Sequence, residues 1–346
     1  MKRSISMLVL GLLATTLIFA AGGSEEAAAG ADQYEIVMVV KLEGVAWFDN
    51  MRIGIQEFNE EFSDVNAYQI GADTADPAAQ VALVEDLIAK GADAILVVPN
   101  DPESLVPAFR RANDQGILTF THEASNQRQV SFDVEAFDNI NYGKHMAEIM
   151  AEWMGGSGVW QPFVGHLTST THNEWVDGEE MLIDEQYPSI KMATDRIEEK
   201  ENQQIAYEKT LELLRTYSDL DAVMGSAMST VPGAAQAIEE MGKIGQVAAF
   251  GTCLPSVAGD YLESGAAMSI HFWVPADAGY ATANVAYKLL EGMDVADGTD
   301  LGRPGYESIT IQENSSGVPV IYGQAWVDVT KDNLDDWKDA NGDYLL

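Results

Sequence analysis

Cysteine is almost absent from this sequence of 346 residues, which contains a single one, Cys253. A disulfide needs two thiols, so no bridge can form within the chain even in an oxidising compartment. The fold must therefore be stabilised by packing, and we expect Cys253 to be structurally dispensable. The chain is long enough for this, because a domain takes roughly 150 residues and two domains with sizeable cores are expected.

Positive charge is also scarce. The sequence has 19 Lys and Arg against 55 Asp and Glu, which gives a formal net charge of −36. Such a field repels phosphate backbones, so the composition excludes nucleic acid as a partner. We interpret the excess of carboxylates as solvation of the surface of an acidic protein.

Long apolar runs are missing once the N-terminus has been passed. Lys2 and Arg3 precede the stretch SMLVLGLLATTLIFA, and small residues follow at 20–22. This is the layout of a secretory signal peptide, which we predict over 1–22, with a disordered leader over 23–32. No Cys stands at the junction to carry a lipid anchor. The mature protein is therefore expected to be soluble and periplasmic, and no later run reaches the ~20 residues of a membrane span.

Familiar catalytic and metal-binding motifs are lacking as well. Neither His-Glu-x-x-His nor Gly-x-Ser-x-Gly occurs. The spacing of His122, Glu123 and His172 matches no metalloenzyme motif, although two imidazoles and a carboxylate are zinc ligands in other proteins. GGSG at 155–158 follows a helical segment and is interpreted as its C-terminal cap, not as a phosphate loop. We therefore predict that the chain is not an enzyme and has no catalytic residue, metal site or cofactor.

What the sequence does contain is a regular alternation of apolar runs and helical segments. YEIVMVVK begins at Tyr34 and reads as a strand, and FDNMRIGIQEFNEEF follows with apolar residues at helical spacing, including Phe48, Met51 and Ile55. Further strands and helices alternate in the same way through GILTFT. Continuous apolar strands separated by helices of ~12–15 residues predict a parallel sheet that is covered on both faces.

The same alternation begins again after residue 160. WQPFVGHL is the first strand of the new series, which continues to a strand at 267–273 and a long helix at about 275–291. Two similar α/β units in one chain leave a cleft between them. The carboxyl ends of the strands meet at that cleft, so it is the expected ligand position.

Three segments carry a family resemblance, namely KLEGVAWFDNMRIGI, GADAILVVPNDPESLVPAFRRANDQGI and YSDLDAVMGSAMSTVPGAAQAIEEMG. They resemble the type I periplasmic binding proteins of sugar ABC transporters. KLEGVAWF, THNEW and VPGAAQA are most similar to the autoinducer-2-binding and rhamnose-binding branch, and the resemblance covers about 33–335. It implies two Rossmann-like domains, with parallel sheets flanked by helices, joined by a three-strand hinge. The expected domains are 33–123 plus 274–312 and 124–273 plus 313–346.

The resemblance also implies ligand-binding residues in the first domain. Trp47 and Phe48 stand where the family covers the apolar face of a sugar ring, although they could instead anchor their helix. Lys41 matches a lysine that hydrogen-bonds the ligand in the autoinducer-2-binding branch. Independently of the family, a cation at the end of a central strand is costly unless it is paired or faces a ligand. Glu123 stands at the acidic position of the family, where it either narrows the pocket or pairs with Lys41.

In the second domain, the segment TSTTHNEW supplies further candidates. Thr171 and His172 stand where the autoinducer-2-binding branch has an Asp followed by a Gln, and Asn173 comes next. Thr171 and His172 can each donate or accept hydrogen bonds, but the loss of the Asp changes which arrangement of ligand hydroxyl groups is favoured. We interpret Trp175 as the first core residue of its helix in preference to a ligand platform.

The remaining candidates follow later strands. Ser226 and Met228 stand where that branch uses Pro and Ala, one of them through backbone groups. Thr252 replaces an Asp of pentose-binding relatives, and Val274 replaces an Asp that follows the Trp, for which Asp277 could compensate. A standard aldose-binding set is therefore not expected. The complete predicted ligand set is Lys41, Trp47, Phe48, Glu123, Thr171, His172, Asn173, Ser226, Met228, Thr252 and Trp273.

Together these features predict a periplasmic substrate-binding protein. It would capture a small sugar or sugar-like polyhydroxy ligand in the interdomain cleft and deliver it to the permease subunits of an ABC importer, acting as a monomer. L-rhamnose, autoinducer-2, a pentose and a small polyol all suit a polar pocket with aromatic walls. The alternative is a sensor component that presents a sugar or autoinducer-2 to a chemoreceptor or histidine kinase.

Overall fold

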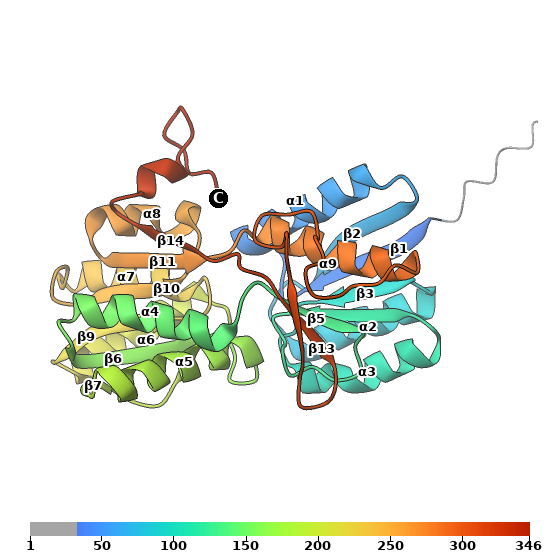
Figure 1. Ribbon diagram of the computed structural model, residues 1–346. Helices are drawn as coiled ribbons and strands as arrows, with labels where there is room; N and C mark the ends of the chain where they lie inside the picture. Colours follow the sequence, from blue (N-terminus) through green and yellow to red (C-terminus); the bar gives the residue numbers. More distant parts are fainter. Residues whose placement is uncertain (1–32) are drawn as a thin grey trace, which may run out of the picture. The chain divides into compact units, whose positions relative to one another are not determined.

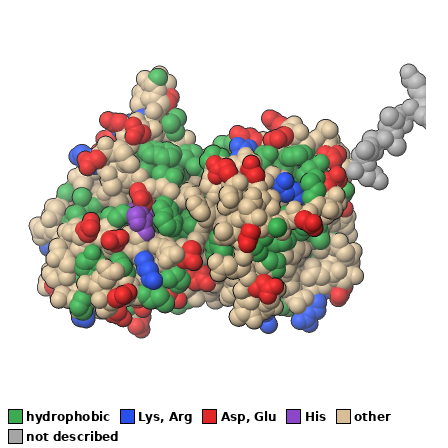
Figure 2. Space-filling model, viewed as in Figure 1, with side chains coloured by type: hydrophobic (Ala, Val, Ile, Leu, Met, Phe, Trp, Pro, Cys, Tyr) green, Lys and Arg blue, Asp and Glu red, His purple; other side chains and the backbone are tan. Residues whose placement is uncertain are grey.

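The computed structural model describes residues 33–346, so the predicted signal peptide and leader lie outside the described residues. This range forms two lobes, each built on one seven-stranded sheet with helices packed on its faces (Figure 1). The predicted α/β fold with two sheets flanked by helices is confirmed. Within 33–346, no helix combines the length and the apolar character that crossing a membrane requires. Acidic side chains are spread over both lobes on the face shown in Figure 2.

The sheet of the first lobe has the strand order β12-β13-β5-β4-β3-β1-β2. All neighbours are parallel except β12 and β13, which are antiparallel. Helices α1 and α9 pack together, as do α2 and α3. The elements are β1 (Tyr34–Val40), α1 (Ala46–Glu61), β2 (Val65–Gly71), α2 (Pro77–Lys90), β3 (Ala94–Val97), α3 (Pro102–Asp114), β4 (Leu118–His122), β5 (Phe132–Glu135), α9 (Pro275–Leu290), β12 (Thr310–Glu313) and β13 (Pro319–Tyr322).

The sheet of the second lobe has the order β14-β11-β10-β9-β6-β7, and β8 pairs with β6 beyond this path. Only β14 runs antiparallel to its neighbour among the pairings described. The elements are α4 (Asn139–Trp153), β6 (Ser157–Val164), α5 (Thr170–Gln186), β7 (Ser189–Met192), β8 (Ile197–Glu198), α6 (Gln203–Thr216), β9 (Leu220–Gly225), α7 (Thr230–Glu240), β10 (Ala248–Thr252), α8 (Pro255–Ser264), β11 (Ala267–Phe272), β14 (Val327–Thr330) and the 3-10 helix η1 (Leu334–Trp337).

Strand β1 illustrates why continuous apolar runs become central strands. Ile36, Met38 and Val40 join the core cluster that contains the buried face of α1, whereas Val37 and Val39 join the cluster of α2 and α3. Successive side chains of a strand point to opposite faces, so a sheet covered on both faces needs apolar residues at every position. This packing fixes the end of β1, and with it the position of the residues that follow.

The chain passes between the two sheets at three places, namely 136–138, 273–274 and 323–326. The expected domain boundaries differ from the strand pairing at two points. Strands β5 and β13 were expected in the second domain, but both hydrogen-bond within the first sheet. Strand β5 is short and carries two acids, and it is accommodated because Asp133 accepts a hydrogen bond from the Thr121 hydroxyl at 2.6 Å.

A glycine on α4 allows a close approach that positions the second lobe's contribution to the pocket. A Cβ atom at Gly143 would lie 1.9 Å from the carbonyl oxygen of Trp175 on α5. Real Cβ atoms do not approach a backbone oxygen so closely, so only glycine fits at this crossing. The contact holds the first turns of α5 against α4 and fixes the side chains that α5 projects toward the first lobe.

Candidate ligand pocket between the lobes

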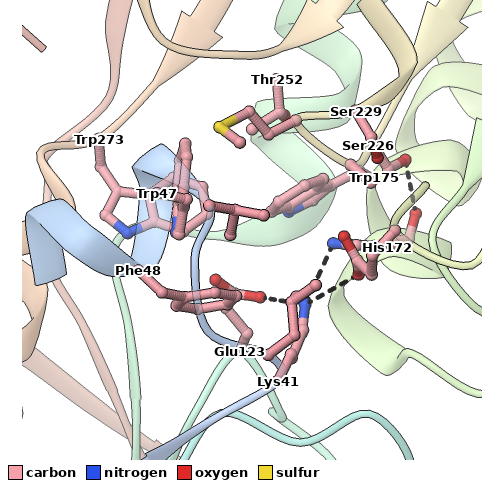
Figure 3. Close-up of a pocket in the computed structure, with 15 residues that line it drawn as sticks. Lys41, Trp47, Phe48, Glu123, His172, Trp175, Ser226, Ser229, Thr252 and Trp273 are labelled. Atoms are coloured by element: carbon pink, nitrogen blue, oxygen red, sulfur yellow. Dashed lines mark hydrogen bonds and ion pairs between the residues drawn. The ribbon is translucent and has the colours of Figure 1, made fainter. Parts of the chain in front are cut away.

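A pocket lies between the lobes where the strands of both sheets end (Figure 3). Lys41 follows β1, Glu123 follows β4, Ser226 follows β9, and Thr252 is the last residue of β10. The cavity has a volume of about 50 Å³. Small-molecule sites usually have roughly 300–1,000 Å³, so a ligand the size of a sugar enters only when the lobes separate or side chains move. The lining residues are Lys41, Leu42, Val45, Trp47, Phe48, Glu123, His172, Trp175, Glu201, Ser226, Ala227, Met228, Ser229, Thr252 and Trp273.

A buried ion pair forms the polar floor of the pocket. Lys41 Nζ donates to Glu123 Oε2 at 2.6 Å, and the two residues are only 2% and 4% exposed. Burial by itself would lower the pKa of Lys41, but the charges of Glu123 and Glu201 outweigh it and the pKa is raised. Lys41 therefore stays protonated. Of the two roles considered for Glu123 from the sequence, the structure shows the pairing with Lys41.

The imidazole of His172 faces this ion pair in its neutral form. Burial lowers the pKa of His172 well below its usual value, and the charges of Lys41 and His166 lower it further. Its Nδ1 accepts a hydrogen bond from the Gly165 backbone N–H at 3.2 Å, which places the ring proton on Nε2. Nε2 lies 3.4 Å from Lys41 Nζ. Both groups are then donors, so an acceptor oxygen placed against them would satisfy both.

Two further polar atoms at the pocket have no partner among the described residues. Glu201 Oε1 lies 3.7 Å from Lys41 Nζ but accepts no hydrogen bond, and Trp273 Nε1 donates none. Glu201 also has a φ of 55° and its neighbour Lys200 one of 58°, in the left-handed region that residues other than glycine rarely adopt. A buried polar group without a partner costs about 1–3 kcal/mol. A polar ligand in the pocket could therefore donate a hydrogen bond to the Glu201 carboxylate and accept one from the Trp273 indole N–H.

Aromatic side chains form the remaining walls. The rings of Trp47 and Trp273 meet edge to face with centroids 4.7 Å apart, and those of Trp175 and Trp273 do so at 5.7 Å. Phe48 also lines the pocket (Figure 3). Edge-to-face packing holds each ring in one orientation. The arrangement presents large, rigid apolar surfaces around a group of hydrogen-bonding atoms.

Nine of the eleven residues predicted from the sequence line this pocket. Thr171 and Asn173 do not. Thr171 is fully buried and donates to Glu135 Oε1 at 3.2 Å, and Asn173 donates to the Ser169 carbonyl at 2.7 Å. All three residues of Thr171-His172-Asn173 belong to α5, in which neighbours are about 100° apart around the axis. When His172 faces the pocket, its two neighbours must point elsewhere.

Sequence reasoning missed part of the lining, above all Glu201 and Ser229. Glu201 lies in a run of charged residues, EEKEN, which resembles a solvated surface loop. Trp175 was interpreted as a core residue, and it is indeed only 1% exposed, yet it also lines the pocket. Its Nε1 donates to Asn139 Oδ1 at 2.8 Å, which ties the ring to α4. Trp175 lies in the second turn of a helix that follows a strand, and this position was the available signal for its role in the pocket.

The comparisons with known proteins agree with this architecture. A family model described as periplasmic binding protein domain matches residues 36–294. The ABC transporter periplasmic-binding protein YphF of Escherichia coli K12 is 21% identical over 76% of this chain and 80% of its own length. The xylitol-binding protein of Mycolicibacterium smegmatis is 28% identical over 75% of this chain and 67% of its own.

Two solved structures are similar to most of this chain. LsrB from Clostridium saccharobutylicum, in complex with AI-2, has a TM-score of 0.81 at 20% identity and covers 88% of this chain and 99% of its own. An ABC transporter solute binding protein from Clostridium phytofermentas, with bound L-rhamnose, has a TM-score of 0.80 at 20% identity, with 89% and 98% covered. At this identity the likeness shows the fold, and it confirms the predicted type I architecture.

Proposed function

Because the chain belongs to the periplasmic binding protein domain family, we propose that it captures a small polyhydroxy molecule between its lobes and delivers it to an ABC importer. It acts in the periplasm as a monomer, binds its ligand without chemical change, and docks on permease subunits when loaded. The candidate ligands are L-rhamnose, autoinducer-2, a pentose and a small polyol. Relatives named as binding xylitol and D-ribose or D-allose, and a similar structure with bound L-rhamnose, support this class.

The observation that carries the proposal is the combination of unpaired polar atoms and aromatic faces in one pocket. Lys41 and His172 present donors, Glu201 Oε1 is a free acceptor, and the indole N–H of Trp273 is unpaired among the described residues. A sugar or polyol carries hydroxyl groups that both donate and accept. A sugar ring also has an apolar face that suits the indole of Trp47.

A thermal-shift screen of the purified protein against sugars and polyols tests the proposal. A ligand at 100 times its dissociation constant adds about 2.7 kcal/mol to the free energy of unfolding. We expect a clear rise in melting temperature with at least one member of a panel containing L-rhamnose, pentoses, xylitol and autoinducer-2. A panel without any shift, at concentrations up to the millimolar range, would contradict the proposed ligand class.

Truncation of the aromatic walls is expected to weaken binding. Trp47→Ala or Phe48→Ala should reduce the binding free energy of the identified ligand by roughly 1–3 kcal/mol, because each ring shields apolar surface at ~25 cal/mol per Å². Isothermal titration calorimetry measures the change. Trp337→Ala is a matched control, since Trp337 packs on Phe272 and does not line the pocket. Unchanged affinity in both wall variants, with lowered melting temperatures, would assign the two rings to the core.

Cys253→Ser is expected to leave ligand affinity within about tenfold of the unsubstituted protein, or 1.4 kcal/mol. The thiol is fully buried and donates to the Met228 carbonyl at 3.3 Å, a hydrogen bond that a serine hydroxyl also makes. Burial raises the pKa of Cys253, so the thiol is not ionised and offers no charge to a ligand. A larger loss in calorimetry would show that the sulfur positions the pocket residue Met228.

A further inference from the structure

Two histidines and an aspartate lie together outside the ligand pocket. His145 on α4, His271 on β11 and Asp328 on β14 each offer a ligand atom, and these atoms all lie within 4.8 Å of one another. His145 Nε2 is 2.8 Å from Asp328 Oδ2, and His271 Nδ1 is 2.7 Å from Asp328 Oδ1. We propose that this cluster is a binding site for a divalent transition-metal ion of the zinc class, with His145, His271 and Asp328 as its three protein ligands.

The donor set and its dimensions fit zinc. Two imidazoles and one carboxylate are a zinc ligand set, and calcium and magnesium prefer oxygen ligands only. With metal–ligand bonds of about 2.0–2.1 Å, the ligand atoms of a tetrahedral site lie about 3.3 Å apart. His145 and His271 contact different oxygens of Asp328, at 2.8 and 2.7 Å, and the three ligand atoms lie within 4.8 Å of one another. To surround an ion at tetrahedral spacing, the separations must change by up to about 1.5 Å. The side chains of His145 and Asp328 are partly exposed and so have room to rotate toward this arrangement.

Neighbouring groups already orient the two rings. His271 is fully buried, and its Nε2 lies 2.9 Å from the Ser269 hydroxyl, so Nε2 can carry the ring proton while Nδ1 faces the metal. The ring of His145 stacks on Trp326, with 11° between the planes and centroids 5.5 Å apart. Fixing the second nitrogen and the plane of a ligating histidine is the usual task of the residues around a metal site.

The cluster is open on one side. The side chains of His145 and Asp328 are 29% and 36% exposed, so an ion can enter and a water molecule can take the fourth position. The cluster is separate from the ligand pocket, since none of its three residues lines that pocket.

A metal ion bound to this cluster would connect three segments of the second lobe that lie next to the crossings between the lobes. His145 lies on the helix that follows the first crossing, His271 on the strand that precedes the second, and Asp328 on the strand that follows the third. One ion would therefore join all three segments where they enter or leave the second lobe. Binding to the folded chain alone stabilises it by mass action. We expect zinc to raise the melting temperature and to hold the hinge ends of the second lobe together.

Zinc titration of the full chain, purified without a histidine tag, tests the proposal. The titration is followed by calorimetry in excess Mg²⁺, which occupies the surface carboxylates of this acidic chain. The variants are His145→Gln and Asp328→Asn. Asp332→Asn is the matched control, because Asp332 is exposed in the turn after β14 and is not part of the cluster. The melting temperature of each variant without metal shows whether it is folded.

We expect the full chain to bind one Zn²⁺. The affinity should fall about tenfold or more in both cluster variants and stay unchanged in Asp332→Asn. The reason for the size of the loss is that removing even a group around a zinc ligand costs roughly 10–100-fold in metal affinity. Absence of saturable binding would overturn the proposal. Binding that survives in both folded cluster variants would overturn it as well, since the ion would then be held elsewhere. If Asp328→Asn does not fold, His145→Gln decides alone, because its side chain is partly exposed.

Discussion

Replacing Lys41 by Met is expected to destabilise the folded chain by about 3–5 kcal/mol, the usual cost of removing one partner of a buried ion pair. Glu123 would keep its charge at 4% exposure with no cation beside it. Glu201, at 3.7 Å from the same ammonium group, would lose its nearest positive charge too. The loss in stability is thus expected to be larger than the loss in ligand affinity that a single charged hydrogen bond of about 1.5–3 kcal/mol would cause.

Urea unfolding of Lys41→Met measures this loss. Lys209→Met is the control, since Lys209 pairs with Glu212 at 3.2 Å on the surface of α6 and an exposed pair contributes about 1 kcal/mol or less. The double variant Lys41→Met, Glu123→Gln should regain part of the stability, because the amide removes the uncompensated charge. A cost for Lys41→Met as small as that for Lys209→Met would show that the pocket floor is hydrated and not buried.

Replacing Glu179 by Gln is expected to stabilise the chain at pH 8–9 and to change little at pH 5. Glu179 lies on α5 with no exposed surface, and neither carboxyl oxygen has a hydrogen-bond partner among the described residues. Burial raises the pKa of Glu179 to about 8, with the charge of Arg196 acting in the opposite direction. The folded chain therefore keeps a proton that the unfolded chain releases near the usual pKa of a glutamate.

The sign of the pH dependence follows from that proton. At pH values between the unfolded and the folded pKa of Glu179, the native state binds more protons than the unfolded state. The contribution of Glu179 to the free energy of unfolding is therefore fully present below the unfolded pKa and is lost as the pH rises to about 8. Each unit of difference corresponds to about 1.4 kcal/mol. The effect of Glu179 alone is thus several kcal/mol. Burial also raises the pKa of Glu199 to about 8 and that of Asp133 to about 7, so the unsubstituted chain should lose stability steadily from pH 5 to 8.

Urea unfolding at several pH values between 5 and 9 gives both curves. Glu179→Gln should show a shallower decline than the unsubstituted protein. Glu185→Gln serves as the control, because Glu185 is exposed on the same helix and its neutralisation should leave the curve unchanged. Parallel curves for the unsubstituted protein and Glu179→Gln would mean that the carboxyl group reaches water in the folded state.

The sequence by itself determined the alternating α/β pattern, and with it the first half of the pocket. A run of apolar residues such as YEIVMVV must be covered on both faces, and the ends of parallel strands meet at one edge of a sheet. Lys41, Trp47 and Phe48 follow such a run directly, so their position at the cleft could be deduced from their order in the chain. Ser226 and Thr252, which the family resemblance pointed to, also line the pocket and stand at the ends of later strands.

Only the tertiary structure decided which side chains turn toward one another. The rotation of α5 brings His172 to the pocket and turns Thr171 and Asn173 away, and it depends on the packing of α5 against α4 at Gly143. Glu201 reaches the pocket because its backbone adopts a left-handed conformation, which a run of charged residues does not reveal. His145 and Asp328 are 183 positions apart and meet only after the chain has crossed between the lobes three times. Periodicity records which face of a strand or helix is buried, but contacts between distant segments depend on how those elements pack.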